Sequence, residues 1–147
     1  MKQKIVHNLI LILIIVNVVL AFYSYLSSVN GAIFCVAGGD CGAVQNSEYG
    51  KMFGMKVSLL GTGAFILLLI AYSFALRHRD FYIFFVLATL LGTIFSIYFI
   101  YLQIAIIKQI CSSCIAVDII IIAIFFLSLH EFVNYKKDFK SIKSYFR

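Results

Sequence analysis

The stretch FYIFFVLATLLGTIFSIYFIYLQIAII, residues 81–107, is predominantly apolar and carries no charged side chain. A helix that crosses a membrane needs roughly 20 such residues at a rise of about 1.5 Å each, and this stretch is longer than that. Its apolar side chains surround the helix instead of following one stripe, as contact with lipid and with other helices requires. We therefore predict that residues 81–107 span a membrane.

Three further segments have the same character, at residues 5–29, 57–76 and 110–132, and the last carries Asp118 within its apolar run. The chain of 147 residues is 63% hydrophobic and 12% charged, with a mean hydropathy of +1.05. Soluble domains are typically about 45–50% apolar and about 25% charged. These values predict an all-α integral membrane protein in which residues 1–147 form a single four-helix bundle.

The basic residues indicate the orientation of the four helices. If the N-terminus is cytoplasmic, most of the 12 Lys and Arg residues lie on that side. They are Lys2, Lys4, Arg77, Arg79, Lys136, Lys137, Lys140, Lys143 and Arg147. The positive-inside rule then places both termini in the cytoplasm and the loop 30–56 outside the cell membrane. The net charge of +6 therefore indicates topology and not a nucleic-acid partner, and the tail 133–147 is expected to contact lipid headgroups.

A cleaved signal peptide is the alternative for the first segment, which has basic residues before an apolar run. The run 5–29 is longer than the 7–15 residues typical of a signal peptide, and no A-x-A-like cleavage site is evident, although Ser27 and Ser28 are small. We expect this segment to stay in the protein as a spanning helix.

Two cysteines, Cys35 and Cys41, lie in the outer loop 30–56 with the sequence VAGGD between them. Glycine accepts a positive φ without steric cost, so the loop can bend back on itself. It can hold an internal disulfide, and it can carry a thiol to another site when that disulfide opens.

The other two cysteines, Cys111 and Cys114, have the C-x-x-C spacing of thiol–disulfide oxidoreductases. They lie where the fourth helix begins, on the same outer side as the first pair. The backbone N–H groups and the dipole of a helix start favour a thiolate, and Lys108 adds a nearby positive charge. A redox-active pair is therefore expected here.

The four cysteines also allow two other interpretations, a zinc site and a pair of structural disulfides. A zinc site with four cysteines usually pairs them as C-x₂₋₄-C, and Cys35 and Cys41 are spaced more widely. Two structural disulfides would fit an oxidising compartment, but a disulfide across two residues contributes little to four helices in lipid. No metal is therefore expected.

Asp118 follows Cys114 by four residues and so lies on the same helix face, one turn deeper in the membrane. A carboxyl group in a membrane indicates a functional site, and in its uncharged form it can donate a hydrogen bond or a proton beside Cys114. The alternative is a structural bond to Gln103, Thr93 or a serine of another helix, the kind of interhelical contact that Asn17 is also expected to make.

The four helices, the cysteine pair in the first outer loop and the C-x-x-C at the last helix resemble the vitamin K epoxide reductase (VKOR) family. Segment 35–61, CVAGGDCGAVQNSEYGKMFGMKVSLLG, is similar to the bacterial and archaeal members at Cys41-Gly-Ala-Val, Asn46-Ser47 and Phe53-Gly54. The resemblance covers residues 5–132 and is to members without a fused thioredoxin domain. Lys56 replaces a proline that is common in prokaryotic relatives, and Asp118 replaces a quinone-contacting tyrosine of vertebrate members.

The resemblance implies an electron relay. A reduced thioredoxin-fold protein of the DsbA kind would attack the Cys35–Cys41 disulfide at Cys35. Cys41 would then attack Cys111, and the released Cys114 would pass electrons to a quinone of the ubiquinone, menaquinone or vitamin K type. Each exchange proceeds by attack of a thiolate on a disulfide sulfur.

The resemblance also implies that Ser47 and Phe53 bind the quinone, and we assign Asp118 to the same site because it stands at the position of the quinone-contacting tyrosine. The Ser47 hydroxyl could hydrogen-bond either a quinone carbonyl or the loop itself. Residues 45–53 alternate polar and aromatic side chains, and we expect a short helix there, lying in the membrane interface over the site.

The sequence also allows three other functions. One is reduction of a vitamin K quinone or epoxide, and another is a DsbB-type oxidase, in which the C-x-x-C and the wider pair occur in the reverse order. The third is a non-enzymatic four-helix protein, such as a small transporter that uses Asp118 as its proton-coupled charge. Transport would not require four cysteines on one side of the membrane.

Overall fold

The computed structural model describes residues 2–30, 41–52, 54–77 and 81–145, and these residues are almost entirely helical. Four helical segments are long and apolar enough to cross a membrane: Ile5–Val29, Val57–Arg77, Tyr82–Ile107 and Ser112–Asn134. The prediction of an all-α membrane bundle is confirmed, and the chain is a multi-pass membrane protein.

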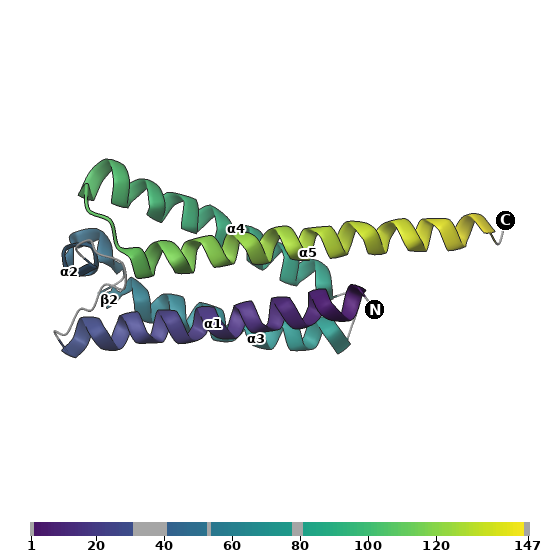
Figure 1. Ribbon diagram of the computed structural model, residues 1–147, viewed down its shortest axis with the longest axis horizontal. Helices are drawn as coiled ribbons and strands as arrows, with labels where there is room; N and C mark the ends of the chain where they lie inside the picture. The colour runs from purple at the N-terminus through teal and green to yellow at the C-terminus, as the bar shows by residue number, and fades with distance from the viewer. Residues whose placement is uncertain (1, 31–40, 53, 78–80, 146–147) are drawn as a thin grey trace.

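The helices pack in a ring in which each contacts two neighbours (Figure 1). Helix α1 (Lys2–Asn30) packs on α3 (Val57–Arg77) and on α5 (Ser112–Tyr145), and α4 (Tyr82–Tyr101) completes the ring between α3 and α5. Their shared core includes Ile14, Leu68, Phe85 and Ile124, one residue from each helix. Many large apolar side chains point outward, where lipid replaces water as their surroundings.

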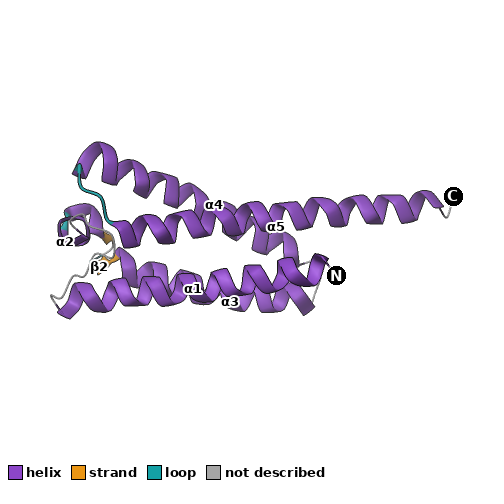
Figure 2. Ribbon diagram, in the orientation of Figure 1, coloured by secondary structure: helices purple, strands orange, loops and turns teal. Residues whose placement is uncertain are grey.

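The outer loop contains several short elements where one helix over residues 45–53 was expected (Figure 2). A short helix is present but begins earlier, as α2 (Cys41–Asn46). The 3₁₀ turn η1 (Glu48–Gly50) follows, and then β1 (Lys51–Met52) pairs antiparallel with β2 (Met55–Lys56).

Helix α2 ends before residue 53 because Ser47 makes hydrogen bonds that begin a new turn. The Ser47 hydroxyl donates to the Val44 carbonyl at 2.7 Å and accepts from the Gly50 N–H at 3.1 Å, which caps the new turn. This turn folds tightly over α2: a Cβ atom on Gly50 would lie 2.5 Å from the Gln45 carbonyl oxygen. Glycine is therefore required at position 50.

The third span, Tyr82–Ile107, agrees with its predicted bounds of 81–107 to within one residue but is not α-helical throughout, and the fourth, predicted as 110–132, spans Ser112–Asn134. The last part of the third is a π-helix, η3 (Leu102–Ile107), which ends at Lys108 in the left-handed conformation, with φ 54°. Helix α5 continues through the predicted tail as far as Tyr145, so that it extends well beyond the other three helices (Figure 1).

Candidate redox site

The C-x-x-C cysteines form a disulfide at the start of α5. Cys111 and Cys114 are joined, with their Cα atoms 5.2 Å apart. Cys111 takes the N-cap position: its sulfur accepts from the Cys114 N–H at 3.3 Å, and its carbonyl accepts from the Ile115 N–H at 3.0 Å. The pair thus lies in the first turn, where the helix dipole favours a thiolate once the disulfide opens.

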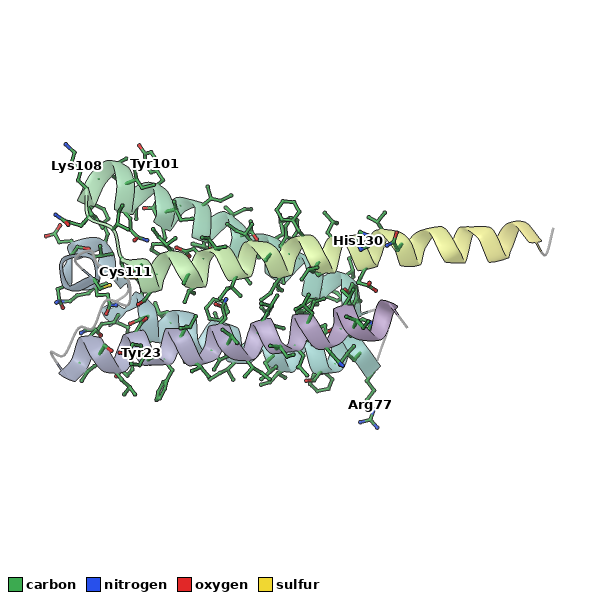
Figure 3. The ribbon with its side chains drawn as sticks, viewed as in Figure 1. Tyr23, Arg77, Tyr101, Lys108, Cys111 and His130 are labelled. Atoms are coloured by element: carbon green, nitrogen blue, oxygen red, sulfur yellow. A yellow bond between two sulfur atoms is a disulfide. The ribbon has the colours of Figure 1, made fainter. Side chains whose placement is uncertain are left out.

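Gln103 holds this pair from the neighbouring helix. Its side-chain oxygen accepts from the Cys111 N–H at 3.0 Å, and the glutamine is only 3% exposed. Its backbone carbonyl accepts from the N–H groups of Lys108 and Gln109, which closes the sharp connection into α5. Lys108 itself is exposed and points away from the bundle (Figure 3). No pattern in the sequence predicted the contact between Gln103 and Cys111.

The loop cysteine Cys41 lies against the C-x-x-C. It begins α2, is buried, and packs with Val44 in one cluster with Cys111, to which Ile107 and Cys114 also belong. Cys41 is disulfide-bonded, and Cys35, the partner that the resemblance implies, lies outside the described residues. Figure 3 shows Cys111 beside α2, at the end of the bundle opposite to Arg77 and His130.

A cavity of about 340 Å³ lies beneath this cluster, between the four spanning helices and the outer loop. Cys114 and Asp118 form part of its α5 wall. Its remaining walls are largely apolar and include aromatic side chains; among the lining residues are Phe65, Phe95, Phe99, Leu60, Leu102 and Ile107. The cavity therefore connects one sulfur of the disulfide with an apolar space inside the membrane.

Asp118 is buried in the wall of this cavity, as its position one turn below Cys114 predicts. Its carboxyl group is hydrogen-bonded to Ser96 of α4. The sequence predicted a serine of another helix as one possible structural partner of Asp118. The two others bond elsewhere, because Gln103 binds the Cys111 N–H and Thr93 donates to the Thr89 carbonyl at 2.9 Å. The expected interhelical contact of Asn17 is also present, to the Val117 carbonyl at 3.3 Å.

The described part of the chain does not place either of the two other residues assigned to quinone binding at the cavity. Ser47 bonds the loop, which was one of its two expected roles, and it is not among the described residues that line the cavity. Phe53 lies outside the described residues. A role of either residue in quinone binding stays a prediction.

Residues 8–129 match the vitamin K epoxide reductase family. The chain belongs to the VKOR family. No individual curated protein gives a significant match. VKOR proteins are membrane oxidoreductases that link disulfide chemistry to quinones, so membership favours an enzyme over a small transporter and agrees with the order of the cysteine pairs.

The cavity fits the quinone that a VKOR protein uses. A quinone is a flat apolar ring with two oxygen atoms that need hydrogen-bond donors, and the cavity offers aromatic walls with a few polar groups. Two of these groups are buried and have no hydrogen-bond partner among the described residues. The Ser24 hydroxyl can donate to a quinone oxygen, whereas Gln45 Oε1 is an acceptor and could bind only a hydroxyl of the reduced quinone. The sequence analysis assigned neither residue to the quinone: Ser24 lies in no recognised motif, and Gln45 was predicted only as part of the segment 45–53 that covers the site.

Proposed function

We propose that this VKOR protein oxidises the dithiol of a DsbA-like thioredoxin-fold partner outside the cytoplasm and passes the electrons to a quinone. The path would run from Cys35 and Cys41 to Cys111 and Cys114. The observation that carries the proposal is the position of the Cys111–Cys114 disulfide, which packs against Cys41 on one side and borders the cavity on the other.

This arrangement supports a definite order of exchange. Opening of the loop disulfide by the partner leaves a thiolate on Cys41, which lies against Cys111. Attack of that thiolate on the Cys111 sulfur forms a Cys41–Cys111 bond, breaks the Cys111–Cys114 bond and leaves Cys114 as the thiolate. Because Cys114 lines the cavity, the electron pair then lies beside the apolar space.

A bound quinone supplies a two-electron acceptor that also takes up two protons. The residues of the chain would orient it: the Ser24 hydroxyl can donate to a quinone oxygen, Gln45 Oε1 can accept from a hydroxyl of the reduced quinone, and the aromatic walls exclude water. Asp118, held by Ser96, lies in the same wall and can deliver a proton at its carboxyl oxygen.

The proposed orientation places the cysteines outside the cytoplasm and both termini inside. It is supported by the excess of Lys and Arg at the end of the bundle opposite to the disulfide. Thiols outside the cytoplasm are oxidised to disulfides, which is the compartment that this chemistry would serve.

The test is quinone reduction in membranes, with a reduced DsbA-like protein as the donor and ubiquinone, menaquinone and vitamin K epoxide compared as acceptors. Cys114→Ser should abolish reduction of the acceptor, whereas Ser112→Ala, between the two cysteines, should retain it. Quinone-dependent oxidation of the donor that survives Cys114→Ser would refute the relay. Reduction of the epoxide alone would favour the alternative of a vitamin K epoxide reductase.

A further inference from the structure

Ionisable side chains gather at the end of the bundle opposite to the cysteines. Each spanning helix contributes one: His7 from α1, Tyr72 from α3, Tyr82 from α4 and Glu131 from α5. His7 Nδ1 lies 2.9 Å from Tyr72 Oη, and the rings of Tyr72 and Tyr82 both pack against Phe85. The Tyr82 ring also stacks on Phe132, the chain neighbour of the buried Glu131. We call these four residues the inner cluster.

Hydroxyl groups lead from the inner cluster into the seam between α4 and α5. The Tyr82 hydroxyl donates to the Ser128 carbonyl at 3.3 Å, and Ser128 lies one turn from Glu131 on α5. The Ser128 hydroxyl is 3.3 Å from the Thr89 hydroxyl, and both side chains are fully buried. Each of the two hydroxyls also donates to a backbone carbonyl of its own helix at 2.8 Å, so a proton can pass between them only when one of them rotates.

From Thr89 the hydroxyl groups continue along α4. Thr93 and Ser96 follow at spacings of four and three residues, which places all three on one helix face. Thr93 donates to the Thr89 carbonyl, and Ser96 is bonded to Asp118. We call Ser128, Thr89, Thr93 and Ser96 the hydroxyl line; it lies between the inner cluster and the cavity that Cys114 borders.

Two buried carboxyl groups distinguish this line from ordinary helix packing. Serine and threonine hydroxyls are enough to join helices in a membrane. Glu131 and Asp118 stand at the two ends of the line, about 20 Å apart along α5, and carboxyl groups at such depths typically mark proton pathways. At the depth of Asp118, Asn17 Oδ1 is buried without a partner among the described residues, an atom that a bound water commonly satisfies.

We propose that the inner cluster and the hydroxyl line conduct protons from the cytoplasmic side to Asp118. The protons that quinone reduction consumes would then come from the cytoplasm and not from the outer water. This inference rests on the proposed function. It adds a second function, because the reaction would move charge across the membrane.

A count of the bonds, electrons and protons in the reaction shows why charge would cross the membrane. For each partner dithiol oxidised, two S–H bonds break, one S–S bond forms, and two electrons and two protons are released. The electrons pass through the two cysteine pairs to the quinone, while the two thiol protons enter the outer water. Two other protons reach the reduced quinone through the Asp118 carboxyl, which Ser96 and the rest of the line resupply from Glu131. Two positive charges therefore cross most of the membrane for each quinone reduced.

The test uses the full chain in vesicles that contain a quinone in the bilayer and a pH-sensitive dye in the lumen. A reduced DsbA-like protein is added outside, so that only molecules with outward cysteines react, and valinomycin with potassium dissipates the membrane potential. The lumen should lose two protons, and the outer medium should gain two, for each quinone reduced. Quinone reduction with no pH change on either side would overturn the proposal, whereas failure to reduce the quinone at all would refute the proposed function instead.

Substitutions in the full chain test whether the protons follow the hydroxyl line. Glu131→Gln and Thr89→Val should slow proton loss from the lumen at least tenfold, while Thr89→Ser, which keeps the hydroxyl, should restore it. The matched control is His130→Gln, because His130 is the exposed neighbour of Glu131 and lies off the line. Proton loss from the lumen at the wild-type rate in both Glu131→Gln and Thr89→Val would exclude the hydroxyl line as the path.

Discussion

Replacing Gln103 with methionine should disturb the site through one lost hydrogen bond. The two side chains are similar in length, but methionine cannot accept the Cys111 N–H, which Gln103 Oε1 now binds at 3.0 Å. Because Cys111 is fully buried, its N–H would be left without a partner, at a cost of about 1–3 kcal/mol. The free energy of unfolding in detergent should fall by about this amount. If the same energy positions Cys111 for attack by Cys41, quinone reduction should slow by roughly 5- to 150-fold.

The assay compares unfolding in detergent with the rate of quinone reduction in membranes. Gln109→Met makes the same substitution in the same connection, at an exposed side chain, and should change neither quantity. Gln103→Glu retains an acceptor oxygen and should recover part of the rate. If Gln103→Met behaved like Gln109→Met in both measurements, the hydrogen bond would not position the disulfide and this reasoning would be wrong.

Three further substitutions test other contacts. Gly50→Ala places a Cβ atom 2.5 Å from the Gln45 carbonyl oxygen. It should lower the free energy of unfolding by about 1–3 kcal/mol in unfolding titrations. The control is Gly63→Ala, which has open space around it and should not destabilise the protein. Asp118→Asn should slow quinone reduction by about 100-fold or more if its carboxyl delivers a proton, while exchange between Cys41 and Cys111 continues; an unchanged rate would leave Asp118 a structural role with Ser96. Cys35→Ser should block electron transfer from the DsbA-like protein but largely retain transfer from a small dithiol, and equal loss with both donors would argue against a shuttle role for the loop pair.

The four spans were predictable because hydropathy is a local property of the chain. Residues 5–29 and 57–76 agree with Ile5–Val29 and Val57–Arg77 to within one residue. The π-helical end of the third span and the left-handed Lys108 were not predictable, since both depend on how Gln103 reaches across to Cys111.

The candidate site was predictable in part. The C-x-x-C spacing indicated the Cys111–Cys114 disulfide, and the spacing of four residues placed Asp118 below Cys114. Its bond to Ser96 depends on the antiparallel register of α4 and α5, and Ser24 and Gln45 line one cavity only because α1 and α2 pack around it. Such contacts between distant segments have no periodic signal in the sequence.

The relay itself can be examined by trapping its internal exchange. In a Cys114→Ser variant, Cys111 has lost its resolving partner, so its thiolate should capture Cys41 in a stable disulfide and release Cys35. Digestion of the variant without reductant, followed by mass spectrometry, identifies which cysteines are joined. Transfer from Cys41 to Cys111 predicts a Cys41–Cys111 linkage. A Cys35–Cys111 linkage, or a Cys35–Cys41 disulfide that persists beside a free Cys111, would contradict it.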